Sequence, residues 1–294
     1  MIDISQARCV FLPDSLFKRR WNLYIAVLLI YTGIFVPLRI AFYDKVDLWV
    51  IIVECFVDLS FLIDIVFSFT SAFDRRDGQV ETRHRKIANR YFKGWFFIDL
   101  ISTLPTQLLE VEWGSDVDFE DATNVKLMRL ARIPRIYKIL RLLRLLKMLR
   151  FLSQNKQISK FTELFQLQGG SQQLVIVATG VLFLTHTTAC LWFMQSKLND
   201  FPCDSWVTLE GIVESPVSMQ YTQAAYWALQ TITTVGFGDI SPKNPSERIF
   251  AIIWMIIGVA FYSYAIGNMT NLIATMDASN EELQAKLSIL KEFK

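Results

Sequence analysis

Cysteine and histidine are scarce in this 294-residue chain. The four cysteines form no CxxC pair, so the sequence suggests neither a disulfide framework nor a zinc site. We also find no catalytic constellation, nucleotide-binding loop or metal-ligand cluster, and we expect no cofactor and no enzymatic activity. The opening residues, MIDISQARCVFLPD, lack the basic-then-apolar pattern of a secretory signal peptide, so the first apolar run is expected to be retained.

Apolar residues, by contrast, are abundant: 52% of the chain is hydrophobic and the mean hydropathy is +0.32. Apolar runs recur, and each is long enough to cross about 30 Å of hydrocarbon. We therefore predict an all-α membrane protein with six transmembrane helices and one shorter re-entrant helix. The predicted spans cover residues 21–43, 48–70, 90–110, 124–152, 170–197 and 246–276, and the re-entrant helix covers 218–232.

Loop charges predict how these spans are oriented. Seven Lys and Arg residues lie between the second and third spans, and three more, at 18–20, precede the first. The positive-inside rule places both regions in the cytoplasm. The loop between the third and fourth spans carries six Asp and Glu residues and is expected outside. Both termini are therefore expected on the cytoplasmic side of a plasma membrane.

The fourth predicted span carries a basic residue at every third position, with apolar residues between them. Each such charge costs about 2.5–3.5 kcal/mol at the centre of a membrane helix, so the run requires a function. Moving one charge through the membrane field is worth about 2.3 kcal/mol per 100 mV, which makes this span a candidate voltage sensor. The basic residues are Lys126, Arg129, Arg132, Arg135, Lys138, Arg141, Arg144, Lys147 and Arg150.

The alternative for this span is a basic amphipathic helix that lies on a membrane surface or binds nucleic acid. Such helices mix spacings of three and four and keep one polar face, whereas strict steps of three spiral around an α-helix. We therefore favour the sensor and expect no nucleic-acid partner.

Acidic residues in the neighbouring spans are expected to pair with these cations, because a buried charge needs a partner. The second span contains Glu54, Asp58 and Asp64, and the third contains Asp99. Phe61 is three residues from both Asp58 and Asp64 and shares their helix face. We predict a charge-transfer site made of Asp58, Phe61, Asp64 and Asp99. The alternatives are lipid or core contact for Phe61 and interfacial solvation for the acids.

The motif TTVGFGD follows the re-entrant helix and matches the signature of potassium-channel filters. A dehydrated K⁺ needs a cage of oxygens, which four copies of an extended strand supply through backbone carbonyls. Glycines permit the positive φ that this arrangement requires. An ordinary glycine turn is the alternative. The motif residues are Thr233, Thr234, Val235, Gly236, Phe237, Gly238 and Asp239, and the predicted K⁺ ligands are the carbonyls of Thr234, Val235, Gly236 and Phe237 with the Thr234 hydroxyl.

Phe237 stands where many such channels carry tyrosine. Phenylalanine cannot donate a hydrogen bond to the surrounding aromatic cuff, which we place at Tyr226 and Trp227. Selectivity is expected to survive because the ligands are backbone atoms, whereas the substitution puts the rigidity of the filter in question.

The order of sensor, connector and pore resembles that of voltage-gated-like cation channels. The segments VPLRIAFYDK (36–45), DFPCDSWV (200–207) and IIGVAFYSYAIGNMTNLIATMDASN (256–280) are most similar to pacemaker-type, hyperpolarisation-activated cyclic-nucleotide-gated channels. They are also similar to the ether-à-go-go and plant inward-rectifier channels. Pacemaker channels depart from the potassium signature and also pass sodium. This sequence keeps the signature, so we expect potassium selectivity.

The resemblance implies a homotetramer, so that the partners of one subunit are three identical subunits, the lipid bilayer and K⁺. It also implies a cytoplasmic gate at the inner end of the sixth span, although helix packing would explain the same stripe. By position, the gate residues are Tyr262, Ile266, Thr270 and Ala274.

The expected organisation follows from these assignments. The family carries a cyclic-nucleotide-binding domain after the sixth span, so we interpret the chain as a fragment or a short form and assign no ligand regulation. The predicted segments are a cytoplasmic N-terminal segment (1–20), a voltage-sensor domain (21–152), a connector (153–169), a pore domain (170–276) and the start of a cytoplasmic linker (277–294).

Three alternatives to a hyperpolarisation-activated potassium channel stay open. One is a nonselective Na⁺/K⁺ channel of pacemaker type, and another is a depolarisation-activated potassium channel. The third is a non-conducting voltage sensor. The basic run indicates a response to voltage but not its direction, and the resemblance favours opening on hyperpolarisation.

Overall fold

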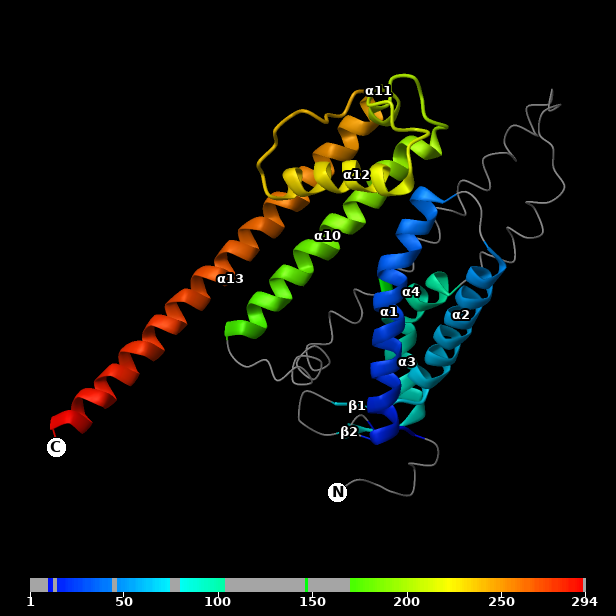
Figure 1. The fold of residues 1–294 in the computed structure, drawn as a ribbon. Coiled ribbons are helices and arrows are strands. Elements are labelled where there is room, and N and C mark those ends of the chain that lie inside the picture. Colours follow the sequence, from blue (N-terminus) through cyan, green and yellow to red (C-terminus); the bar gives the residue numbers. More distant parts are fainter. Residues whose placement is uncertain are drawn as a thin grey trace. The chain divides into compact units, whose positions relative to one another are not determined.

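The computed structural model describes residues 10–12, 15–43, 47–74, 80–103, 146–147 and 170–292. The chain divides into two compact units, Met1–Asn155 and Lys156–Lys294. Helices dominate the described part of both units, which confirms the prediction of a mainly helical chain (Figure 1).

Two long helices, α1 (Leu16–Phe42) and α2 (Leu48–Phe69), form the core of the first unit. The chain enters α1 at Ser15, whose hydroxyl accepts a hydrogen bond from the backbone N–H of Lys18 at 3.3 Å and so caps the helix. Leu29 of α1 packs with Val57 and Phe61 of α2, and Phe61 is completely buried. A short antiparallel pair, β1 (Phe73–Asp74) and β2 (Val80–Glu81), follows α2.

The third predicted span differs from the structure at its start. The sequence predicts a single helix from residue 90 onward. In the structure, α3 (His84–Lys93) covers the start of this range and ends at Lys93, and a separate helix, α4 (Phe96–Ser102), begins after a turn. The break lies at Gly94, whose backbone has φ −108° and ψ −95°. Helix α3 buries only Ile87 and Tyr91, and most of its other residues are charged or polar, so it is a short amphipathic helix and not part of an apolar span. The rest of that predicted span lies outside the described residues.

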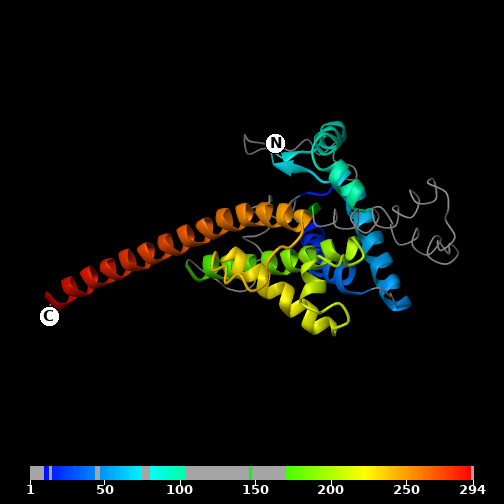
Figure 2. The ribbon, with the colours of Figure 1, turned by 90° about the horizontal axis from the view of Figure 1, so that it is seen from above.

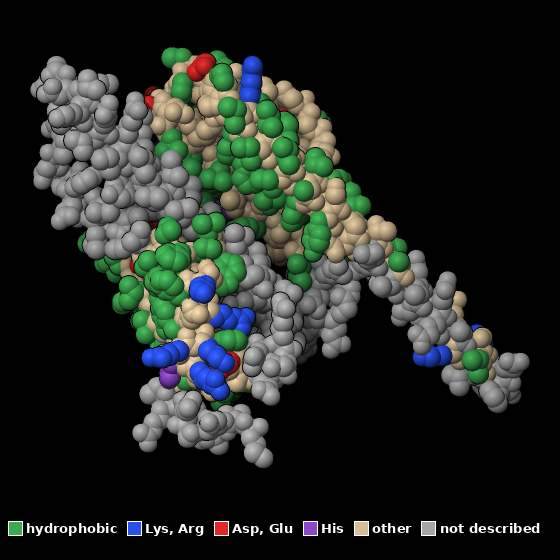
Figure 3. All heavy atoms as spheres, turned by 180° about the vertical axis from the view of Figure 1, so that it is seen from behind, with side chains coloured by type: hydrophobic (Ala, Val, Ile, Leu, Met, Phe, Trp, Pro, Cys, Tyr) green, Lys and Arg blue, Asp and Glu red, His purple; other side chains and the backbone are tan. Residues whose placement is uncertain are grey.

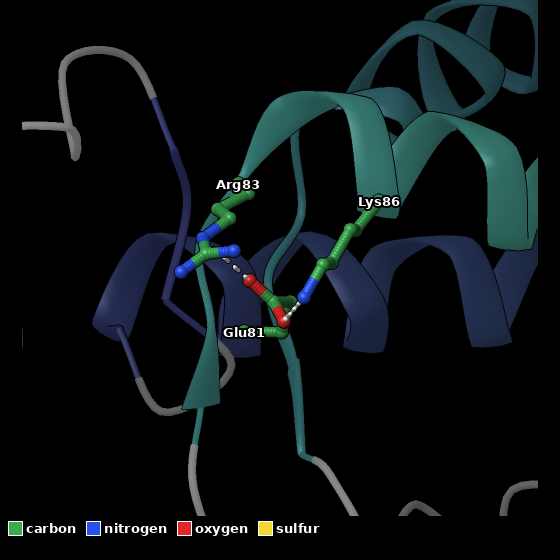
Figure 4. A network of polar contacts seen from close by, with 3 residues as sticks. All are labelled: Glu81, Arg83 and Lys86. Atoms are coloured by element: carbon green, nitrogen blue, oxygen red, sulfur yellow. Dashed lines mark hydrogen bonds and ion pairs between the residues drawn. The ribbon is translucent and has the colours of Figure 1, made fainter.

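Basic side chains gather at the end of the first unit where α3 lies, beside hydrophobic ones (Figure 3). One acidic residue, Glu81, lies among them and contacts Lys86 at 3.1 Å and Arg83 at 3.8 Å (Figure 4). The hydrogen bond from Lys86 is the main cause that lowers the pKa of the Glu81 carboxyl. The contact ties β2 to the first turn of α3.

We expect the Glu81 cluster to stabilise the first unit at neutral pH and not in acid. A carboxyl whose pKa is lowered on folding contributes stability above its ordinary pKa, and this contribution is lost as the pH falls through the lowered value. Glu81→Gln should therefore lower the melting temperature of the purified protein slightly at pH 7, and the difference from the unmodified protein should vanish on acidification. A difference that grows in acid would contradict this expectation.

The second unit contains α10 (Gly170–Leu198), α11 (Trp206–Leu209), α12 (Val217–Ile232) and α13 (Pro245–Glu292). Helix α12 crosses α10 and α13 where those two approach each other, and the C-terminal part of α13 extends away from the other helices of the unit (Figures 1 and 2). The predicted sixth span and the polar tail after it are thus one continuous helix.

A stack of aromatic rings holds the second unit together where its helices cross. Trp192 of α10 is completely buried, and its ring centroid lies 3.9 Å from that of Trp227 of α12. Trp206 of α11 and Phe250 of α13 stack on Trp192 at 5.4 and 5.7 Å. One residue of α10 therefore contacts the three other described helices of the unit through aromatic packing, which fixes the end of the unit where α12 lies.

Three helical stretches among the described residues are long and apolar enough to cross a membrane, namely Leu16–Phe42, Leu174–Leu198 and Pro245–Thr270. Each coincides with a predicted span. The predicted fourth span lies outside the described residues except for Leu146 and Lys147.

Candidate functional site

The residues of the TTVGFGD motif form an extended segment directly after α12. Positive φ angles occur at alternate positions, with values of 62° at Thr234, 57° at Gly236 and 80° at Gly238. Alternation of this kind turns successive peptide planes so that their carbonyls can face the same way, and it is the backbone pattern that an oxygen-lined path for a cation requires. Gly236 and Gly238 adopt it without strain, whereas Thr234 is one of three non-glycine residues with positive φ in the described part of the chain.

Gln230, in the last turn of α12, braces this segment. Its backbone carbonyl accepts hydrogen bonds from the N–H groups of Val235 and Gly236 at 3.0 and 3.1 Å. Its side-chain oxygen accepts from the N–H of Phe237 at 2.9 Å, and its side-chain nitrogen donates to Asp239 at 3.2 Å. With its N–H groups occupied on the α12 side, the strand keeps its carbonyls free for other partners.

Asp239 closes the motif with a second contact to α12. The hydroxyl of Tyr226 donates to its Oδ2 at 2.6 Å, and the backbone N–H of Ile240 donates to its Oδ1 at 2.9 Å. These hydrogen bonds stabilise the carboxylate and lower the pKa of Asp239, the Tyr226 contact most of all. The two ends of the segment are therefore tied to the same helix.

Tyr226 and Trp227, the residues of the predicted aromatic cuff, have different neighbours within the chain. The Tyr226 ring lies parallel to that of Phe237 with centroids 6.5 Å apart, but Trp227 packs on Trp192. The Gln230 side chain accepts from the backbone N–H of Phe237 and donates to the carboxylate of Asp239, so its amide joins these two residues.

Removal of the Tyr226 hydroxyl should loosen the Asp239 end of this segment. Tyr226→Phe keeps the ring that stacks on Phe237 and deletes only the donor to Asp239. If this segment conducts potassium, as the sequence predicts, current through it should decay severalfold faster during a long voltage step, because the segment loses one tie. Tyr264→Phe, at an exposed tyrosine of α13, is the matched control and should leave the decay unchanged. Equal decay rates in both variants would disprove the role of this contact.

The carboxylate of Glu247, in the first turn of α13, joins four stretches of chain around the motif. It is 1% exposed and accepts hydrogen bonds from the Ser196 hydroxyl at 3.2 Å, the Trp206 N–H at 3.1 Å and the Lys243 N–H at 2.8 Å. The backbone N–H of Glu247 is itself capped by the Asn244 side chain at 2.9 Å. The ends of α10, α11 and α13 and the loop after the motif thus meet at one buried acid.

In the first unit, α2 buries the acidic face that the sequence predicts. Asp58, Phe61 and Asp64 are 7%, 0% and 9% exposed, respectively. The Lys147 ammonium lies 3.9 Å from the centre of the Phe61 ring and donates to the Thr103 hydroxyl at 2.9 Å. One cation of the predicted sensor thus lies on the aromatic ring of the predicted charge-transfer site, in a cation–π contact.

The other predicted members of this site have hydrogen-bond partners of their own. Asp64 accepts from the indole N–H of Trp21 in α1 at 2.9 Å. Asp99 is completely buried and accepts from the hydroxyl of Tyr91 at 2.6 Å. These contacts hold the acids in place on α2 and α4. The other eight basic residues of the predicted sensor lie outside the described residues, and so does the connector 153–169.

The predicted gate residues form one exposed stripe on α13. Tyr262 and Ile266 are 38% and 48% exposed, and Thr270 and Ala274 are also exposed. Gly258, earlier on the same helix, is a close-packing position, because a Cβ there would lie 3.2 Å from Cα of Ile232 at the end of α12.

Several residues that shape these sites have no motif that would single them out in the sequence. They are Gln230 and Glu247 in the second unit, and Arg39, Tyr91 and Thr103 in the first. The only signal for Glu247 is its place three residues after Asn244, which is typical of a helix cap but says nothing of its other partners.

Comparison with known proteins gives a family match over most of the chain. The family described as "Ion transport protein" matches residues 18–281. The chain is 29% identical to Potassium voltage-gated channel unc-103 of Caenorhabditis elegans, with 97% of this chain and 35% of that protein covered. It is 29% identical to Potassium channel KAT1 of Oryza sativa subsp. japonica, with 94% and 36% covered.

A third relative is Potassium/sodium hyperpolarization-activated cyclic nucleotide-gated channel 4 of Rattus norvegicus, which is 32% identical over 96% of this chain and 24% of that protein. The resemblance seen in the sequence is therefore confirmed. The chain spans about a third or less of the length of these curated relatives.

Proposed function

Because the chain belongs to the ion transport protein family, we propose that it is a subunit of a voltage-gated, potassium-selective channel. The observation that carries this proposal is the TTVGFGD segment after α12, with positive φ at residues 234, 236 and 238. Its N–H groups bond back to α12, so its carbonyls are left to coordinate a dehydrated cation. The ligands would be the carbonyls of Thr234, Val235, Gly236 and Phe237, with the Thr234 hydroxyl.

The same segment supports the proposal of a tetramer. One strand supplies too few oxygens to replace the hydration shell of K⁺, so four copies around an axis are needed. The segment is exposed in a single chain, with Val235 and Phe237 at 55% and 72%, as expected of a surface that other subunits and the ion would cover. The partners are then three identical subunits, the lipid bilayer and K⁺.

The voltage sensor is the second part of the proposal. The basic run from Lys126 to Arg150 would move past the buried face of α2, where Asp58, Phe61, Asp64 and Asp99 form the charge-transfer site. The position of Lys147 on Phe61 supports this, because an aromatic ring can hold a cation without a fixed counter-charge while neighbours exchange partners. The full organisation would have six spans, with both termini cytoplasmic and the gate at Tyr262, Ile266, Thr270 and Ala274.

Gating polarity is proposed as opening on hyperpolarisation. One relative bears this property in its name, although that channel is named for potassium and sodium together. The unaltered TTVGFGD motif favours potassium alone.

A voltage-clamp recording tests the proposal. The expressed chain is stepped to negative and positive voltages while external sodium is exchanged for potassium. Inward current at negative voltage, with a reversal potential that follows potassium, is the expected result. A reversal potential that ignores potassium would overturn the selectivity, and outward current evoked only at positive voltage would overturn the polarity.

A further inference from the structure

Arg39 and Glu54 form a buried ion pair between α1 and α2. Arg39 Nε lies 2.6 Å from one carboxylate oxygen of Glu54, and its Nη2 donates to the other at 2.9 Å. Only 12% of the arginine side chain and 4% of the glutamate side chain are exposed. Two-point contacts of this kind between a guanidinium and a carboxylate are the strongest form of salt bridge, and burial makes the loss of either partner costly.

Glu54 belongs to the same face of α2 as the proposed charge-transfer site. It is four residues before Asp58, and the buried positions of α2 include both acids together with Phe61 and Asp64. At a rise of 1.5 Å per residue, Glu54 lies about 15 Å along the helix from Asp64. Asp64 is bonded to the first part of α1 through Trp21, whereas Glu54 is bonded to its last turn through Arg39.

A sensor cation that moves along this face of α2 would therefore meet acids that have different partners. Phe61 already holds Lys147, which belongs to the basic run. Glu54 holds Arg39, which belongs to α1 and is fixed there by its helix. Glu54, the acid nearest the start of α2, is thus neutralised by a cation of α1, which does not move with the sensor.

We propose that Arg39 takes the place of a sensor cation. It pairs with the Glu54 carboxylate and thereby keeps that carboxylate from pairing with the basic residues of the sensor. This inference rests on the proposed voltage-sensing function. In the proposed orientation, Arg39 and Glu54 lie toward the outer side of the membrane. Arg39 then shifts the equilibrium between the outward and inward positions of the sensor, because the sensor cations lack the Glu54 carboxylate as a partner when they are displaced outward.

The consequence has a definite sign. Arg39→Gln exposes the Glu54 carboxylate to the sensor cations and stabilises the outward position. Glu54→Gln leaves the Arg39 charge without its carboxylate, so that repulsion between like charges stabilises the inward position. Arg39→Gln/Glu54→Gln removes both charges and should restore the balance of the unmodified protein.

Gating currents of the full chain measure this balance directly. The expected result is a change of at least about tenfold in the outward-to-inward equilibrium constant for each single variant, in opposite directions, since breaking a buried pair leaves an uncompensated charge. The double variant should lie close to the unmodified protein. Single-variant shifts below twofold, shifts of both single variants in the same direction, or a double variant that keeps the full shift of either single variant would overturn the proposal.

Two further comparisons keep the test decisive. Asp47→Asn removes an exposed charge beside the start of α2 and should produce no comparable shift, which controls for a change in surface potential. If Arg39→Gln does not reach the cell surface, addition of the same change to Glu54→Gln must still reverse the inward shift. Failure to reverse it would overturn the proposal.

The two hypotheses fail in different ways. If the unmodified protein shows no gating current at any voltage, the proposed voltage-sensing function is wrong. If gating current is present and Arg39→Gln leaves its voltage dependence unchanged, only the role of Arg39 is wrong.

Discussion

Gly236→Ala is expected to reduce potassium current at least tenfold while the protein still reaches the cell surface. The φ of Gly236 is +57°, in the region where an L side chain costs about 1–2 kcal/mol. In the proposed tetramer the strain would occur four times around the proposed ion path, so it would sum to about 4–8 kcal/mol against the conducting shape. A Cβ at Gly236 would meet no atom within 4 Å of its own chain, so the effect comes from the backbone.

Gly211 offers a matched control. Its φ is +67°, and a Cβ there would also meet nothing within 4 Å, but it lies in the loop before α12. Gly211→Ala therefore introduces the same kind of strain outside the proposed filter and should leave selectivity and current per channel unchanged. Surface labelling with whole-cell recording distinguishes the two variants. Full potassium current in Gly236→Ala would show that the segment does not conduct.

The second large effect is expected at Glu247. Glu247→Gln keeps the size of the side chain but replaces one acceptor oxygen by a donor group, which then faces a backbone N–H. Each buried group left without a partner costs about 1–3 kcal/mol, and the carboxylate serves Trp206, Lys243 and Ser196. We expect a clear fall in the melting temperature of the purified protein and faster loss of current during sustained opening.

Two companion variants separate the causes. Glu210→Gln changes an exposed acid near α11 and should have no measurable effect on melting or current. Ser196→Ala removes only the weakest of the three contacts, at 3.2 Å, and should lower the melting temperature less than Glu247→Gln does. If Glu247→Gln melts like the unmodified protein, the carboxylate does not hold the ends of α10, α11 and α13 together.

Phe237 lacks the tyrosine hydroxyl, which puts the rigidity of the proposed filter in question. The segment has other ties, since the Gln230 side chain accepts a hydrogen bond from the backbone N–H of Phe237 and the Gln230 carbonyl accepts from Val235 and Gly236. A side-chain hydroxyl is one way to stiffen such a segment, and an amide that bonds two of its residues is another. Neither Gln230 nor its hydrogen bonds belong to the motif, because the helix that precedes the motif supplies them.

The sequence by itself determined the elements with strong local signals. Long apolar runs predicted α1, α2, α10 and α13, since a segment that must shield its backbone in hydrocarbon has to be apolar over its whole length. The glycine spacing of the motif predicted positive φ at Gly236 and Gly238. The acid and aromatic spacing on α2 predicted a buried polar face.

Only the tertiary structure decided which polar groups meet. Glu54 is one of the acids that the sequence offers to the sensor, and in the structure it forms an ion pair with Arg39 of another helix. The third predicted span breaks at Gly94, and Glu247 gathers donors from residues 196, 206 and 243. Such contacts join residues that are distant in sequence. Apolar periodicity reports that a side chain is buried, but it carries no information on the partner that satisfies it.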